Sequence, residues 1–197
     1  MSGTESTKIG RTLHAVAAWL RVEGVPFALI GGLAATVRGR VRATEDINLV
    51  VGCGVDRALG LLKASDAAGF APAVDEVREL IEIAFVLPLE HIGTGVRIDL
   101  ALGLTLFEQE AIGRATETAI AGGSIPVVTA EDLLIMKLLA DRPQDQQDIV
   151  GLIEEASDHF DWPHCHGLAE EFAAEVEVDL RPRLRQLEER FRNRPPA

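Results

Sequence analysis

An acidic residue and an amide residue, Asp46 and Asn48, open the apolar stretch "DINLVV" at residues 46–51. If this stretch forms a strand, both side chains emerge on the same face and can reach one cation. Carboxylate oxygens are the protein ligands that Mg²⁺ prefers, and Asn offers only a neutral carbonyl oxygen in their place. The pattern indicates a metal-binding strand that lacks one charge. A half-buried strand whose polar residues face water has the same pattern.

A second acidic residue, Asp99, lies in the alternating stretch 95–102, where apolar side chains fill one face. Such alternation is typical of a strand. A carboxylate in the middle of an apolar strand is costly unless it is paired or bound to a cation. Two strands that each present an acid to one point predict a cation site more strongly than either strand does alone.

Two glycines, Gly31 and Gly32, follow the short apolar run 27–30 and precede a predicted short helix. A strand that ends in glycines at a helix start exposes free backbone N–H groups, and the missing Cβ atoms let a phosphate approach closely. The pair therefore predicts a phosphate cradle near the cation site. Taken alone, Gly-Gly is also an ordinary turn.

Lys137 is the only charged residue in the apolar helical run 133–140. Its stem is therefore expected to be buried, with the ammonium directed at a specific partner. Asp145 and Asp148 are three residues apart and share one face of the next predicted helix. The alternative is a lysine that reaches solvent, together with an Asp145 that only stabilises a helix N-terminus.

The elements that must position these residues predict an α+β fold, with a small mixed β-sheet flanked by helices and then a helical carboxy-terminal segment. Strands are predicted at 27–30, 46–51, 71–75, 80–87, 95–102, 117–121 and 125–128. Longer helices are predicted at 5–23, 55–68, 105–115, 130–141, 144–157, 165–176 and 179–193. Thr129 is a good helix cap. The change of pattern there divides the chain into a core, 1–129, and a helical segment, 130–197, which is expected to complete the active-site cleft around these residues.

Composition limits the possible partners. A chain of 197 residues, 47% of them hydrophobic, fits one domain or one domain with a small appendage. The polar amino terminus and the lack of an apolar run of about 20 residues predict no membrane partner and a cytoplasmic location. The formal net charge of −12 disfavours a generic nucleic-acid binder.

Two local stretches depart from this acidic, apolar background. The tail 179–194 contains six arginines, which predicts a solvated amphipathic helix, with a phosphate-tracking surface as the alternative. The stretch 158–167 is rich in His, Cys and Asp, but its spacing matches no standard zinc finger. It is expected to be a polar loop between helices, with a metal site as the alternative.

The motifs lie in three stretches, "ALIGGLAATVRGRVRATEDINLVV", "VRIDL" and "VVTAEDLLIMKLLADRPQDQQDI". In this order they resemble the nucleotidyltransferase superfamily, and more narrowly the AbiEii-like type IV toxins and related bacterial nucleotidyltransferase-like proteins. The resemblance spans roughly residues 27–150. It implies a nucleotidyltransferase core and a nucleoside triphosphate as substrate.

The resemblance also implies two Mg²⁺ ions, one that activates an acceptor hydroxyl and one that steadies the departing pyrophosphate. Asp46, position 48 and Asp99 would hold these metals, and Asp99 would also help to position the acceptor. The implied catalytic residues are Asp46, Asn48, Asp99 and Lys137.

The residues implied for nucleotide binding are Gly31, Gly32, Arg38, Arg42, Lys137, Asp145 and Asp148. The glycines would hold the phosphates, and Lys137 would contact the triphosphate. One of the two aspartates would fix Lys137 or the nucleotide. The arginines would add positive charge near the phosphates, and Arg42 has the alternative of being a structural partner for Glu45 or Asp46.

Asn48 stands where the resembling family has a second carboxylate. The loss of one of three negative charges should weaken binding of the second metal and slow turnover. Either the chain is naturally a degenerate member, or Asn48 is an inactivating replacement that allows a toxic protein to be expressed.

Three functions fit these motifs. The leading one is transfer of a nucleoside monophosphate to an acceptor hydroxyl of tRNA or another RNA, by a toxin with a cognate antitoxin protein as partner. The second is nucleotidylation of a small-molecule antibiotic. The third is a pseudo-enzyme that binds a nucleotide or a partner with little catalysis.

Overall fold

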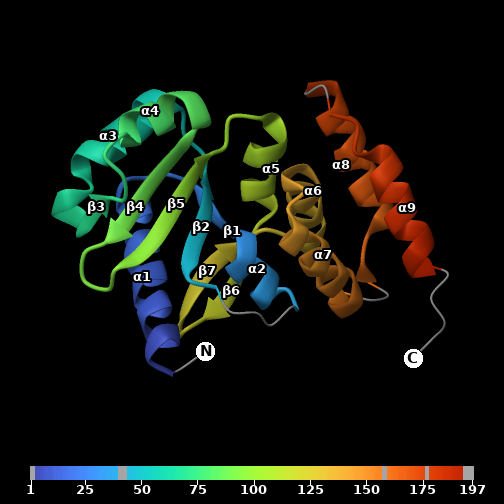
Figure 1. The fold of residues 1–197 in the computed structure, drawn as a ribbon, viewed down its shortest axis with the longest axis horizontal. Coiled ribbons are helices and arrows are strands. Elements are labelled where there is room, and N and C mark those ends of the chain that lie inside the picture. The colour runs from blue at the N-terminus through green and yellow to red at the C-terminus, as the bar shows by residue number, and fades with distance from the viewer. Residues whose placement is uncertain (1–2, 40–43, 157–158, 176–177, 193–197) are drawn as a thin grey trace.

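A mixed β-sheet forms the centre of the structure (Figure 1), a computed structural model that describes residues 3–39, 44–156, 159–175 and 178–192. The strand order is β3-β4-β5-β2-β1-β7-β6. The strands are β1 (Phe27–Ile30), β2 (Asp46–Val51), β3 (Phe70–Pro72), β4 (Val86–His91), β5 (Val96–Leu102), β6 (Thr116–Ile120) and β7 (Gly123–Val127). The sheet and its flanking helices confirm the predicted α+β fold.

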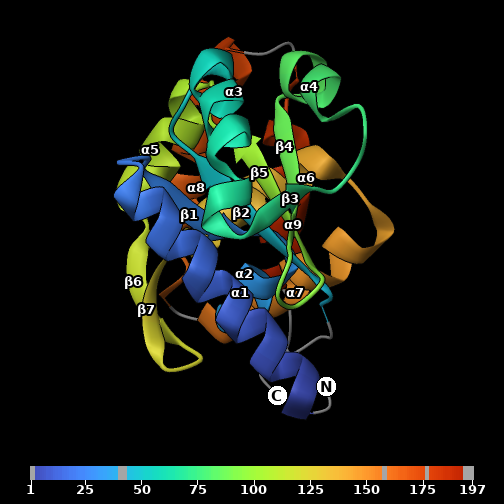
Figure 2. The same ribbon diagram turned by 90° about the vertical axis from the view of Figure 1, so that its left-hand side faces the viewer.

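The helices cover both sides of this sheet. They are α1 (Gly3–Val22), α2 (Gly31–Val37), α3 (Val55–Ala64), α4 (Val77–Glu79), α5 (Leu106–Arg114), α6 (Ala130–Ala140), α7 (Pro143–Ala156), α8 (Trp162–Glu175) and α9 (Arg181–Arg192). Helix α1 crosses one side, and α6 to α9 lie together on the opposite side (Figures 1 and 2). No helix within the described ranges has both the length and the apolar character needed to cross a bilayer.

The central strands β2 and β5 explain why the polar residues gather on one side. The two strands run parallel and are directly hydrogen-bonded neighbours. Ile47, Leu49, Ile98 and Leu100 are fully buried, so the apolar faces of both strands enter the core. Because side chains alternate along a strand, the polar residues between them must share the opposite face.

The helical segment has an apolar core of its own. Thr129 caps α6, since its hydroxyl oxygen accepts a hydrogen bond from the backbone N–H of Asp132 at 3.1 Å. Leu134 and Leu138 on α6 pack with Ile149 on α7 in a cluster that extends to α8 and α9. Packing on this cluster orients the junction between α6 and α7.

The predicted strand at 80–87 is wrong in its first half. Residues Leu80–Ala84 form a π-helical turn, Phe85 has a φ of 55°, and β4 begins at Val86. Val86 is paired with Ala101, next to the last residue of β5. Residues before 85 therefore have no partner strand, and their β-branched side chains cannot form a ladder.

Smaller boundary differences occur elsewhere. The predicted helix 55–68 ends at Ala64 and continues as the 3₁₀ turn Asp66–Ala68. The stretch 158–167 is not the expected loop throughout, because α8 begins at Trp162. Within it, Cys165 is buried, and burial raises the pKa of its thiol. His166 Nε2 lies 2.7 Å from Glu188 Oε2 on α9, so this part of the stretch packs one helix on another.

Candidate active site

The connection from β1 to α2 requires a glycine. Gly31 begins α2 directly after the strand and has a φ of +71°, a region that other residues rarely adopt. A Cβ atom at Gly31 would lie 2.9 Å from the Cβ atom of Asn48. The predicted strand-glycine-helix turn is therefore present, and its first glycine packs directly on the candidate metal strand.

Replacement of Gly31 by Ala is expected to lower the free energy of unfolding by about 1–3 kcal/mol, because the left-handed conformation and the contact with Asn48 both oppose a Cβ atom. Chemical denaturation measures the change. Gly113→Ala in α5 is the matched control, since a Cβ atom there meets nothing within 4 Å and helix propensity favours Ala. Equal stability of Gly31→Ala and the parent would contradict the expectation.

Strands β2 and β5 bring the predicted acids together. Asn48 is paired with Asp99 and Asp46 with Arg97 across the parallel ladder. The Thr44 hydroxyl donates to Asp46 Oδ1 at 3.0 Å, and Arg97 Nε donates to Asp99 Oδ1 at 3.3 Å. Asp46, Asn48 and Asp99 thus occupy adjacent positions on one face, with both carboxylates held by neighbouring side chains.

The donor set of this face fits one Mg²⁺ ion. Two carboxylates and an amide carbonyl are ordinary magnesium ligands, and the ion keeps several waters. Across the described ranges, no three His, Cys, Asp or Glu side chains converge on one point. Because Asn48 is neutral, the only anions among these three ligands are Asp46 and Asp99, which leaves few for a second divalent cation to share.

Arg97 would compete with a bound cation for Asp99. Its side chain is 54% exposed, and its guanidinium forms an ion pair with Asp99 at 3.3 Å. Arg97→Gln is expected to raise Mg²⁺ affinity by up to about fivefold. That factor corresponds to about 1 kcal/mol, the most that an exposed ion pair usually contributes. Titration calorimetry with MgCl₂ measures it, with Arg78→Gln as control because Arg78 pairs with Glu82 on the surface at a different site. Unchanged affinity in Arg97→Gln would show that this ion pair does not oppose the metal.

A pocket of about 150 Å³ lies between the turn at Gly31, the start of β2 and the junction of α6 with α7. It is lined by Gly31, Gly32, Thr44, Glu45, Asp46, Asn48, Arg142 and Gln144. Larger cavities lie along α7 and α9, but none of the predicted catalytic residues lines them. Four of the sequence-predicted residues, Gly31, Gly32, Asp46 and Asn48, therefore meet at the small pocket, whereas Asp99 does not line it.

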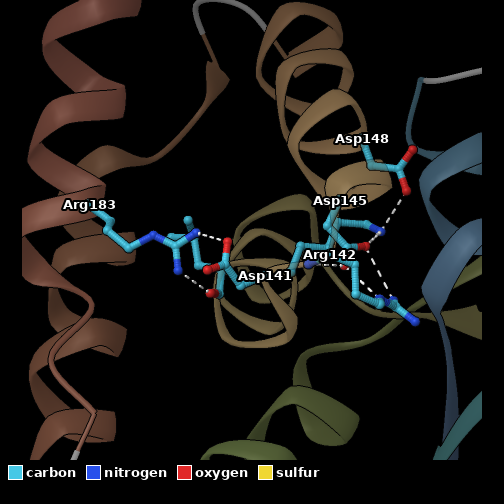
Figure 3. Close-up of polar contacts among 7 residues, drawn as sticks. Asp141, Arg142, Asp145, Asp148 and Arg183 are labelled. Atoms are coloured by element: carbon cyan, nitrogen blue, oxygen red, sulfur yellow. Dashed lines mark hydrogen bonds and ion pairs between the residues drawn. The ribbon is translucent and has the colours of Figure 1, made fainter.

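Lys137 lies behind this pocket rather than on its wall. Its ammonium donates to Asp145 Oδ1 at 3.1 Å and to Asp148 Oδ2 at 2.7 Å, and all three side chains are buried. Asp145 in turn accepts from Arg142 Nε at 2.7 Å (Figure 3). The predicted aspartates thus contact Lys137, and they link it to a cation that does line the pocket.

The charges of this group stabilise one another. Burial by itself raises the pKa of Asp145, but hydrogen bonds from Arg142 and Lys137 outweigh burial and hold that pKa below its usual value. The hydrogen bond to Asp145 correspondingly raises the pKa of Arg142, and the negative charge of Asp46 adds to this effect. Asp145 and Arg142 therefore both favour their charged forms beside the pocket.

Of the two predicted arginines, the structure describes Arg38, which does not line the pocket. Arg38 Nε donates to the carbonyl of Val128 at 2.9 Å, and its Nη2 donates to Val127 and to Thr116. Arg38 therefore fastens α2 to the end of β7. Arg42 lies outside the residues that the structure describes.

Sequence reasoning gave no role to three residues that line the pocket. Thr44 sits two positions before Asp46, a spacing that places it beside the carboxylate. Arg142 and Gln144 lie at the junction of α6 and α7. In the sequence, Arg142 and Gln144 stand out only as polar residues at a helix junction close to a lone buried lysine. The direction in which their side chains point depends on how the helices pack.

Comparison with known proteins supports the class of fold. No protein-family model and no curated protein matches the chain. Several solved structures do, and they are nucleotidyltransferases or nucleotidyltransferase-like proteins. The antibiotic-resistance factor ANT(2'')-Ia, solved in solution, has a TM-score of 0.55 and 19% identity, covering 98% of this chain and 100% of that chain. The fold is therefore that of the nucleotidyltransferases.

Two further structures give the same result. An antigenic nucleotidyltransferase-like protein from Paracoccidioides brasiliensis has a TM-score of 0.53 and 19% identity, covering 94% of each chain. The lincosamide antibiotic adenylyltransferase LnuA, bound to lincomycin, has a TM-score of 0.51 and 18% identity, covering 72% of this chain and 94% of that chain. At these identities the likeness shows the fold alone, and the narrower AbiEii-like resemblance stays a prediction.

Proposed function

We propose that this protein transfers a nucleoside monophosphate from a nucleoside triphosphate to an acceptor hydroxyl, with Mg²⁺ at the metal strand. One observation carries the proposal: Asp46 and Asp99 share one face of adjacent parallel strands, beside the turn at Gly31. Carboxylates next to a backbone that phosphates can approach are the elements that such a transfer needs.

Each residue has a role that follows from its position. Asp46, Asn48 and Asp99 would hold the metal, and Asp99 would also orient the acceptor hydroxyl. Gly31 and Gly32 line the pocket, and their backbone would face the phosphates there. Mg²⁺, when bound, neutralises phosphate charge and favours loss of the acceptor proton. Thr44 keeps the Asp46 carboxylate in one orientation through the hydrogen bond to its Oδ1.

RNA is the acceptor that we place first, with a toxin role and an antitoxin partner. The arginines of α9 favour it, because Arg185 and Arg190 are exposed. Others in this helix are paired with acids, as in Arg181 with Asp179 and Arg192 with Glu188, which reduces the charge that a phosphate backbone would meet.

A small-molecule antibiotic is the second candidate acceptor. Two of the structures that share this fold carry antibiotics, since LnuA was solved with lincomycin and ANT(2'')-Ia with adenylyl-2''-tobramycin. An aminoglycoside or a lincosamide therefore belongs in the same assays as RNA. A pseudo-enzyme that binds nucleotide without transfer is the third candidate, and Asn48 is the residue that favours it.

Binding and transfer together test the proposal. Thermal shift with MgCl₂ and each of the four nucleoside triphosphates shows whether the pocket binds a nucleotide. Incubation with labelled triphosphate and either total RNA, an aminoglycoside or a lincosamide shows which acceptor becomes labelled. Binding without labelling of any acceptor supports the pseudo-enzyme, and the absence of both binding and labelling rejects the function.

Asn48→Asp is expected to raise Mg²⁺-dependent transfer severalfold or more, because it restores a third anion to the metal face. The same labelling assay measures it, with the MgCl₂ concentration varied so that metal affinity and maximal rate are separated. Asp and Asn have nearly the same shape, so the contact with Gly31 is kept. Equal activity of both proteins with the correct acceptor would remove Asn48 from the mechanism.

A further inference from the structure

We propose that Arg142 is the side chain that contacts the phosphates of the nucleotide, and that buried Lys137 is a positioning residue that acts through Asp145. This role rests on the proposed function, since it concerns the same pocket. It differs from what the family resemblance implies, namely that Lys137 itself contacts the triphosphate.

Lys137 is committed to the interior. Only 3% of its side chain is exposed, and its ammonium bridges Asp145 and Asp148, whose side chains are 1% and 0% exposed. To reach a phosphate, the ammonium would have to leave at least one of these carboxylates. Breaking a buried ion pair from one side is strongly unfavourable, so the ammonium stays with its partners.

Arg142 is placed to contact an anion. Its side chain is 56% exposed and lines the pocket together with Gly31, Gly32 and Asp46. Within the described part of the pocket wall, it is the only cationic side chain. A planar guanidinium can bind a carboxylate along one edge and a phosphate along another, which an ammonium bridging two buried acids cannot do.

The free edge of Arg142 is defined by its bonds to Asp145. Nε and Nη2 donate to the two oxygens of Asp145 at 2.7 and 3.2 Å. Nη1 has no hydrogen-bond partner among the residues that the structure describes. In Figure 3 the guanidinium extends away from α7 toward the blue ribbon of the amino-terminal part of the chain. Arg142 therefore presents donors toward the side where the glycine turn lies.

Lys137 determines how strongly Asp145 holds the arginine. Asp145 forms ion pairs with both Lys137 and Arg142. Without the lysine, the full charge of Asp145 would act on the guanidinium and draw it inward. Because Lys137 neutralises part of the negative charge of Asp145, part of the positive charge of Arg142 remains available to a phosphate.

The turn that carries Arg142 is held from a second side. Asp141 ends α6 in the left-handed region, with a φ of 49°. Arg183 on α9 donates to the carbonyl of Leu138 at 2.8 Å and to the Asp141 carboxylate (Figure 3). The backbone before Arg142 is thus fixed by α9, while its side chain is fixed by Asp145.

Binding of inorganic tripolyphosphate, measured by calorimetry with MgCl₂ present, tests Arg142. Arg142→Ala is expected to weaken binding roughly 10- to 100-fold, as removal of a charged contact does. Arg142→Lys, which keeps the charge but loses the planar edge, is expected to lie between Arg142→Ala and the parent. Arg181→Ala, which removes a surface guanidinium from α9, is the control and should bind as the parent does.

The outcomes separate this role from the function on which it rests. If the parent binds tripolyphosphate and Arg142→Ala binds equally well, the role of Arg142 is overturned while the proposed function stands. If the parent binds neither tripolyphosphate nor any nucleoside triphosphate, the proposed function itself fails.

Lys137 is tested in the unaltered protein, because its replacement disturbs folding. The chain has three lysines, Lys8, Lys63 and Lys137, of which the first two are exposed. An amine-acylating reagent, with each peptide read by mass spectrometry, should label Lys8 and Lys63 quickly and Lys137 slowly, with or without tripolyphosphate. A Lys137 that reacts as fast as Lys63 and is protected by tripolyphosphate would show direct contact and overturn its positioning role.

Discussion

Replacement of Lys137 by Met should lower the free energy of unfolding by about 3–5 kcal/mol, the effect of breaking a buried ion pair from one side. The methionine fits the apolar part of the site, but it removes the ammonium that pairs with the buried carboxylates of Asp145 and Asp148. Urea denaturation followed by circular dichroism measures the change. A protein of ordinary stability has about 5–15 kcal/mol in total, so this loss would be a large fraction of the free energy of unfolding.

Lys63→Met is the matched control for that experiment. Lys63 lies in the last turn of α3 and is exposed, so the same replacement there should change stability by no more than about 0.5 kcal/mol. Lys137→Met combined with Asp148→Asn should recover part of the loss, because one of the two buried charges is then neutral. A loss of less than about 1 kcal/mol in Lys137→Met would show that water or another group satisfies the aspartates.

Asp46→Asn should reduce nucleotide transfer roughly 100-fold or more, since a metal contributes several kcal/mol to the stabilisation of charge in such a reaction. With Asn48 already neutral, the metal face would keep Asp99 as its only anion. The Thr44 hydroxyl can still donate to the amide oxygen, so folding should be preserved. The labelling assay with the identified acceptor measures the rate, and urea denaturation checks that stability is unchanged.

Asp56→Asn is the control for this loss. Asp56 is exposed in the first turn of α3. Its replacement by Asn removes the same charge from the protein without changing a residue of the pocket. Mg²⁺ affinity should fall in Asp46→Asn and stay constant in Asp56→Asn. Transfer by Asp46→Asn at the parent rate would exclude this carboxylate from the reaction.

Much of the candidate site could be predicted because it depends on short-range patterns. Alternation along β2 and β5 placed Asp46, Asn48 and Asp99 on polar faces. The step from a buried strand to two glycines predicted the turn at Gly31. The pairing of Asn48 with Asp99 could not be read from either strand, because register depends on which strands become neighbours in the sheet.

The rest depends on packing between elements that are distant from the metal strand. A lone lysine in an apolar helix can extend to solvent or pair with buried acids, and for Lys137 the packing of α6 on α7 decides the outcome. The same packing turns Arg142 toward the pocket. The segment before Phe85 shows the opposite failure, since "LIEIA" has the composition of a strand but lies beyond the ends of β3 and β5, the two strands that pair with β4.

The tight contact between Asn48 and Gly31 has a consequence for inheritance. Asn and Asp codons differ by a single base, and the two residues differ by one terminal atom group, so the space beside Gly31 accepts either one. Thr44, Asp46 and Asp99 already occupy the positions that a third carboxylate would join. A lineage carrying this gene therefore stands one point mutation from a third acid on the face that we propose binds Mg²⁺, and it can cross that step in either direction without rebuilding the fold.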